Sequence, residues 1–126
     1  MHVPTDAFQG RSPEVAACDA LKRLFTMVAV RCVLAEERDS ETGKTLQKYL
    51  DATPMVADGN DWMKGLMASD DARARAAALR LLEVRKKYAD EVFDFEACRE
   101  VVVEEIKMEN DKLMGDYVRR LLPKVE

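Results

Sequence analysis

The residues that could perform catalysis or hold a metal are few in this sequence of 126 residues. His2 is the single histidine, which removes Ser/His and Cys/His catalytic pairs and most zinc sites. Cys18, Cys32 and Cys98 stand alone without C-x-x-C spacing, a pattern that favours a reducing compartment over a disulfide framework. The sequence therefore predicts no metal site and offers no nucleophile with a base.

Two further patterns are too weak to indicate an enzyme. The segment Gly43-Lys44-Thr45 lacks the upstream glycine of a phosphate-binding loop. Glu104 and Glu105 have the chemistry of a general acid or base, but they lie in a charged helical pattern typical of a solvated face. We therefore expect a protein that is not an enzyme and that uses no cofactor.

Charge and hydropathy exclude two other kinds of partner. Twenty basic and 24 acidic side chains give a net charge of -4, whereas binding to a phosphate backbone requires an excess of Lys and Arg. A basic patch is predicted at Arg73, Arg75, Arg80, Arg85, Lys86 and Lys87. No aromatic residue lies among these cations, so a nucleic-acid site is disfavoured. No apolar run reaches the roughly 18 residues that a membrane span needs.

The spacing of apolar residues predicts an all-α protein. These residues recur at intervals of three and four, and only five glycines and four prolines interrupt them. Residues 1–11 are expected to form a flexible arm, without the apolar core of a signal peptide or the composition of a transit peptide. Residues 12–126 are expected to form a single helical domain.

Capping residues place the ends of four expected helices. The first begins after Ser12 and runs to about Glu37, and a short second helix begins after Ser40. A third short helix follows Asp58-Gly59, and the longest pattern runs from about residue 69 to 122. A straight helix of about 50 residues would measure about 75 Å. We expect a bend near Asp94, which can cap a fresh turn.

The segment Leu24 to Leu34, LFTMVAVRCVL, carries apolar side chains in almost every direction around a helix. This helix could lie at the centre of a four-helix bundle, or a second subunit or bound peptide could cover one flank. Its two short neighbours cannot enclose it alone, and the apolar stripe from Phe95 to Leu122 is longer than a bundle of this size covers. These features favour a homodimer.

Two segments of the chain resemble RbcX, a family of Rubisco assembly chaperones. In FTMVAVRCVL, the residues that match the first-helix signature of the family are Thr26, Ala29, Val30 and Arg31. In ALRLLEVRKKYADE, the residues that match the start of its long helix are Leu79, Arg80, Leu82, Val84 and Arg85. Trp62 falls where the family has a tyrosine. The resemblance covers about residues 17–120 and includes the order of the helices.

The resemblance implies an arc-shaped homodimer of four-helix protomers, each with a long, bent last helix. It also implies an ATP-independent chaperone in the chloroplast stroma. Such a chaperone clamps the C-terminal segment of the Rubisco large subunit in a hydrophobic groove at the dimer interface. Polar corners of the arc contact a neighbouring large subunit. The alternative is a helical scaffold or protein-interaction module without chaperone activity.

The resemblance also assigns residues to the groove and to the corners. The groove set is Leu24, Met27, Val28 and Arg31. The polar corner set is Glu36, Asp39, Arg80 and Arg85. Two groove tyrosines of the family fall on Leu24 and Met27, so the apolar contact is kept and the hydroxyl hydrogen bonds are lost. These departures favour the divergent chloroplast branch of the family.

Overall fold

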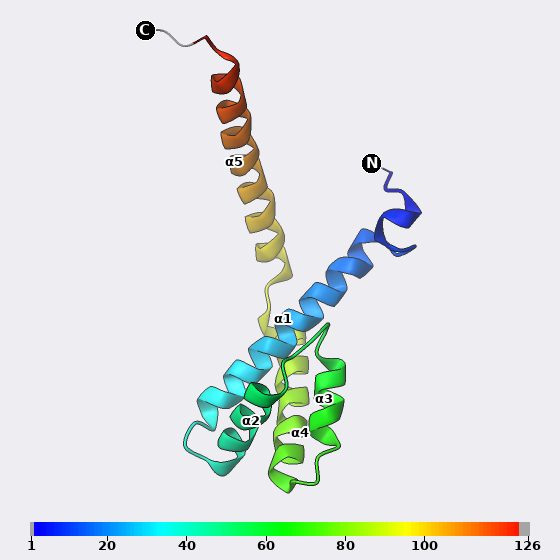
Figure 1. Ribbon diagram of the computed structural model, residues 1–126, viewed down its shortest axis with the longest axis vertical. Coiled ribbons are helices and arrows are strands. Elements are labelled where there is room, and N and C mark those ends of the chain that lie inside the picture. Colours follow the sequence, from blue (N-terminus) through cyan, green and yellow to red (C-terminus); the bar gives the residue numbers. More distant parts are fainter. Residues whose placement is uncertain (1, 124–126) are drawn as a thin grey trace. The chain divides into compact units, whose positions relative to one another are not determined.

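The computed structural model describes residues 2–123, and in that range it contains five α-helices and no strand. Residue 1 and residues 124–126, the ends of the predicted arm and domain, lie outside the described residues. The helices are α1 (Pro13–Glu36), α2 (Glu41–Ala52), α3 (Asn60–Met67), α4 (Ala72–Lys87) and α5 (Phe95–Leu121) (Figure 1). The predicted all-α fold is confirmed.

The predicted capping residues begin the helices. The hydroxyl of Ser12 accepts a hydrogen bond from the backbone of Val15 at the start of α1, and Pro13 is the first helical residue. Ser40 caps α2 in the same way, and the Asp71 carboxylate accepts from the backbone of α4. These side chains satisfy backbone donors that the first helical turn leaves free, which explains why local sequence sets the boundaries.

The chain divides into two compact units, one ending at Val92 and one beginning at Phe93, and each is described by itself. In the first unit α4 packs against α1, α2 and α3, and Figure 1 shows α1 crossing it. The face of α4 that makes these contacts is formed by Ala74, Ala77, Ala78 and Leu81. Small alanines let the neighbouring helices approach closely, and larger side chains fill the space around them. The largest fully buried side chains are Leu46, Leu66, Leu81, Val30, Val33 and Thr26.

The long helical pattern at the C-terminus is interrupted where the sequence predicts a bend. A π-helical turn, Tyr88–Val92, follows α4 directly. The second unit begins with Phe93 and Asp94 outside any helix, and the Asp94 carboxylate accepts a hydrogen bond from the backbone N–H of Ala97 at 2.9 Å. That cap starts α5, which has no buried residue among those described.

The remaining predictions concern membrane-spanning segments and the division into an arm and a domain. None of the helices in the described range has the length and hydropathy to cross a membrane. The single domain over residues 12–126 and the flexible arm before it stay predictions. In the arm a short 3-10 helix spans Thr5–Phe8.

Two glycines sit where side chains would collide. A Cβ on Gly43 would lie 1.9 Å from the Glu37 carbonyl oxygen, so the start of α2 lies against the end of α1. Gly59 has a φ of 87°, and its Cβ would lie 2.7 Å from Cγ2 of Thr26. From the sequence alone Gly43 is only a weak helix former. Its close contact with Glu37 depends on how α2 packs against the end of α1, which the sequence pattern does not show.

We predict that Gly59→Ala destabilises the fold by at least about 1 kcal/mol, since it adds left-handed backbone strain and a collision with Thr26. Gly115→Ala is the control, because Gly115 lies within α5 with ordinary space for a Cβ. Alanine there should be neutral or stabilising by up to about 1 kcal/mol. Urea denaturation followed by circular dichroism measures both, and equal midpoints for the two variants would contradict the prediction.

Candidate functional site

The first helix presents opposite faces to the core and to solvent. Its buried residues are Phe25, Thr26, Ala29, Val30 and Val33. At about 100° per residue, the predicted groove residues fall on the opposite side of the helix. Leu24 is 43% exposed and Arg31 is exposed, while Met27 and Val28 are partly buried, with Met27 packed against the core cluster. The structure therefore brings the predicted groove set onto one outward face of α1.

The predicted polar corner is partly assembled at the far end of the same helix. Arg80 of α4 places Nη2 3.2 Å from Oε2 of Glu36 and Nη1 3.3 Å from Oε2 of Glu83. The hydrogen bond to Glu36, followed by the charge of that carboxylate, raises the pKa of Arg80 above its usual value. Asp39 lies in the turn after α1, and Glu36 and Asp39 line the same hollow of about 450 Å³. Glu36, Asp39 and Arg80 thus share one end of the first unit.

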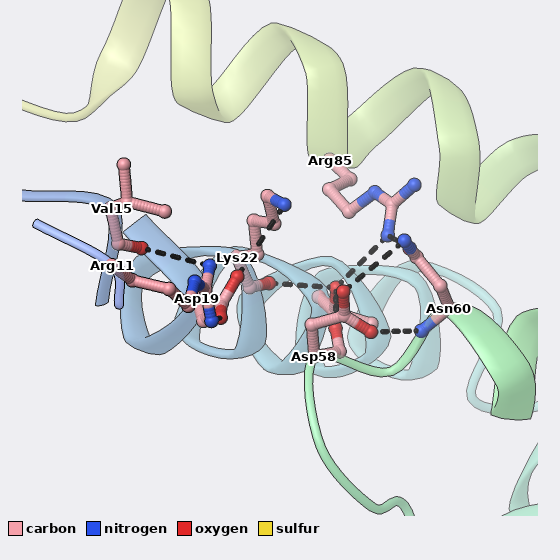
Figure 2. A network of polar contacts seen from close by, with 8 residues as sticks. Arg11, Val15, Asp19, Lys22, Asp58, Asn60 and Arg85 are labelled. Carbon is pink, nitrogen blue, oxygen red and sulfur yellow. Dashed lines mark hydrogen bonds and ion pairs between the residues drawn. The ribbon is translucent and has the colours of Figure 1, made fainter. Parts of the chain in front are cut away.

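Arg85 is turned away from that corner and into the body of the first unit. Its Nη1 donates to Oδ1 of Asn60 at 2.8 Å and to Oγ1 of Thr26 at 3.2 Å. Figure 2 shows the side chain of Arg85 reaching from α4 toward Asn60, beside Asp58. One guanidinium therefore joins α4, α1 and the start of α3.

Thr26 is the buried centre of this contact. Thr26 is only 1% exposed. Its hydroxyl group donates to the carbonyl oxygens of Lys22 at 2.8 Å and Asp58 at 3.1 Å. The Asp58 carboxylate accepts from the backbone N–H of Asn60 at 3.0 Å. A buried hydroxyl with donors and acceptors supplied is stable, whereas loss of any partner leaves a polar group unsatisfied.

The segment between α2 and α3 is also held from the outer side of α1. Arg23 donates from Nη1 to the carbonyl oxygen of Ala57 at 3.0 Å, and from Nη2 to that of Met55 at 3.5 Å. Ala57 has a φ of 52°, a conformation that L-residues rarely adopt, and such strain persists where the surroundings hold it. Arg23 and Thr26 therefore hold this segment against α1. In the sequence they directly precede Leu24 and Met27, two of the predicted groove residues.

A further ion pair joins the predicted arm to α1. Arg11 donates from Nη1 to the Asp19 carboxylate, which also lies 3.6 Å from Nζ of Lys22 (Figure 2). The hydrogen bond from Arg11 lowers the pKa of Asp19 below its usual value. Because that pKa is depressed in the folded state, the contact is fully present above the ordinary carboxylate pKa and is lost as pH falls through the folded value. It is intact at neutral pH.

The predicted groove residues share one face of α1, and three of the four predicted corner residues share one end of the first unit, but the sequence does not reveal the contacts that hold these elements together. The six predicted cations of 73–87 do not act as one patch, because Arg80 pairs with Glu36 while Arg85 is directed to Thr26. The hydrogen bonds of Arg23 to the segment before α3 and of Asn60 to Arg85 join residues distant in the sequence, so no local sequence pattern predicts them. Within the described range, no cluster of three His, Cys, Asp or Glu residues has the geometry of a metal site.

The fold and the exposed apolar side chains define an all-α protein without the features of a metal site in the described residues. The protein is all-α, with a four-helix unit and a separate long helix, and apolar side chains are exposed on the outer face of α1 and along α5. A sequence model of the RbcX protein family matches residues 13–123. The chain is also 36% identical over 120 residues to Chaperonin-like RBCX protein 1, chloroplastic, of Arabidopsis thaliana, covering 94% of this chain and 67% of that protein. The chain belongs to the RbcX family, whose members are chaperone-like proteins.

Solved structures of the family have the same fold. AtRbcX1 from Arabidopsis thaliana matches with a TM-score of 0.83 and 32% identity, over 93% of this chain and 99% of that one. RbcX-IIa from Chlamydomonas reinhardtii, solved in complex with the RbcL C-terminal tail, matches with a TM-score of 0.72 and 34% identity. That match covers 84% of this chain and 97% of the other.

We predict that Arg85→Met lowers the free energy of unfolding by about 1 to 3 kcal/mol, because it removes the donor to Thr26 and Asn60. Thr26→Val in the Arg85→Met background should cost less than it does alone, since the two residues share one contact. Urea denaturation of the two single variants and the double variant measures this coupling.

The matched control is Arg80→Met, which removes two exposed ion pairs, with Glu36 and with Glu83. Its denaturation midpoint should stay close to that of the parent, because exposed pairs contribute little. Equal losses for Arg80→Met and Arg85→Met would contradict the assignment of Arg85 to a structural contact.

Proposed function

We propose that this chain is an ATP-independent, non-enzymatic chaperone of Rubisco assembly that binds the C-terminal tail of the large subunit. The observation that carries the proposal is the outward face of α1, where Leu24 is 43% exposed beside Met27 and Val28. It is supported by family membership and by a relative solved with the RbcL C-terminal tail. In this proposal Leu24, Met27, Val28 and Arg31 line the peptide groove.

A homodimer would supply the second side of that groove. Helix α5 has 27 residues, about 40 Å, and no buried side chain among those described. Its exposed large apolar residues are Phe95, Val101, Val102, Val103, Ile106, Met108, Leu113, Met114, Tyr117, Val118 and Leu121. An apolar surface of this length on a lone helix needs a partner, and a two-fold contact between copies buries it on both at once.

The polar end of the first unit would contact a second large subunit. Glu36, Asp39 and Arg80 gather there, and their charges suit a contact that sets orientation more than affinity. Arg85 would contribute indirectly, by holding α4 to α1. The chloroplast stroma is the proposed location, in keeping with the chloroplastic relative from Arabidopsis thaliana.

We predict that Leu24→Glu and Met27→Glu each weaken binding of a peptide with the sequence of the RbcL C-terminal tail by at least about tenfold. The physical reason is that peptide binding would remove the new carboxyl group from water, which costs free energy whether the group stays charged or takes up a proton. The parent affinity should be on the order of micromolar, because burial of a few apolar side chains is offset by the cost of ordering the peptide. Isothermal titration calorimetry measures both.

The control for the groove is Leu79→Glu, which makes the same change at an exposed leucine of α4. It should bind the peptide as the parent does. Peptide binding by Leu24→Glu at the parent level would refute the groove, and no binding by the parent would favour the alternative of a helical scaffold without chaperone activity.

We predict that the parent sediments as a dimer at micromolar concentration and that Val102→Glu/Tyr117→Glu shifts it to monomer. Both positions are about half-exposed on α5, so the substitutions leave the four-helix unit intact and place charges in the proposed interface. Analytical ultracentrifugation separates the species. A parent that is monomeric at this concentration would contradict the dimer.

A further inference from the structure

A cationic cleft lies between α1 and α2 in the first unit and shares Arg31 with the proposed groove. Its volume is about 890 Å³. Arg31 and Arg38 line it from α1 and the turn that follows, and Lys44 and Lys48 line it from α2. Asp51 is the single carboxylate among the lining residues. The protein as a whole carries a net charge of -4, so this excess of positive charge is a local feature.

Most of these cations are not neutralised within the chain. Asp51 accepts a hydrogen bond from Nε2 of Gln47 at 2.8 Å, and Lys44 lies 3.6 Å from the carboxylate of Glu41. Across residues 2–123, no ion pair is formed by Arg31, Arg38 or Lys48. Four cations and one carboxylate line the cleft, and this excess of positive charge favours the binding of carboxylates.

The lining favours an acidic peptide over a nucleic acid. Leu34, Ala35 and Ala52 add apolar surface to the lining beside the cations. Single-stranded nucleic acids are held by aromatic side chains that stack with bases, and no aromatic residue is among those lining the cleft. The apolar lining can contact the methylene groups of glutamate and aspartate side chains, and the cations can pair with their carboxylates.

The cleft continues the outward face of α1. Arg31 belongs to both the proposed groove and the cleft. From Leu24 to Ala35 the helix rises by about 16 Å, a length that about five residues of extended peptide span. A client segment with apolar side chains against Leu24 would therefore reach the cleft about five residues further along.

We propose that the cleft between α1 and α2 binds an acidic segment of the client polypeptide, about five residues from the apolar side chains held in the groove. The identity of this client rests on the proposed function. The cationic site itself does not, because it follows from the lining residues alone.

The test compares two double variants with equal changes in net charge. Arg38→Glu/Lys48→Glu reverses two cations of the cleft, whereas Lys64→Glu/Lys87→Glu reverses two exposed cations outside it. The probe is a fluorescent octaglutamate peptide, and its binding is measured by anisotropy at low salt. The cleft variant should bind at least about tenfold more weakly than the parent, and the control should stay within about twofold.

Three results would overturn the cleft. One is equal loss in both double variants, which would report only net charge. The second is unchanged binding by the cleft variant in a protein whose circular dichroism matches the parent. The third is displacement of the probe by inorganic phosphate or a 20-nucleotide single strand more readily than by unlabelled octaglutamate, which would indicate a phosphate site.

A second arm separates this inference from the proposed function. Full-length large subunit should be held more weakly by Arg38→Glu/Lys48→Glu than by the control pair. Arg38→Gln/Lys48→Gln should give an intermediate loss, since it removes charge without reversing it. If the parent bound octaglutamate in the cleft but not the tail peptide, the chaperone proposal would fail and the cleft would stand. If the parent bound the tail peptide, but the two double variants bound neither probe differently, the cleft would fail and the chaperone proposal would stand.

Discussion

The contact of Arg85 with Thr26 and Asn60 is the constraint on which the arrangement of the first unit depends. It links the last turn of α4, the middle of α1 and the start of α3 through one guanidinium, with distances of 3.2 and 2.8 Å. Thr26 sits on the buried side of α1, so this contact fixes which side of the helix turns inward. Leu24 and Arg31 lie on the opposite side of the helix and are exposed.

The same contact joins the two separate segments that carry the resemblance to RbcX. Thr26 belongs to FTMVAVRCVL and Arg85 to ALRLLEVRKKYADE, 59 residues apart in the chain. They meet in the folded unit, where a buried hydroxyl and a guanidinium satisfy each other. A change at either residue removes one hydrogen bond from the other, which links the two segments physically beyond their apolar pattern.

Local physics made much of the fold predictable, and non-local contacts account for the rest. Ser12, Ser40 and Asp94 act on backbone groups within three residues, so their sequence context is sufficient to place helix ends and the interruption before α5. The partner of Arg85 depends on how three helices pack, and periodicity along one helix carries no such information. For the same reason the sequence placed Arg85 with the polar corner residues, although its side chain contacts Thr26. The groove positions were predictable as one face of α1, but the occupant of that face is a matter of binding and stays a proposal.

Apolar and charged surfaces have complementary consequences for a chaperone that must release its client. Leu24 and Met27 offer burial, which is non-directional and accepts many apolar side chains. Neither Leu24 nor Met27 carries a hydroxyl, so these two side chains offer no directional hydrogen bond to a bound peptide. Selectivity would then come from charged side chains: Arg31 and Arg38 lie further along α1 and the turn after it, and Lys48 of α2 lines the same cleft. Exposed charge contacts are individually weak and are screened by salt, so they can select a segment without holding it permanently. A groove that supplies modest affinity and a cleft that supplies discrimination would together permit recognition with rapid release, as a transient assembly factor requires.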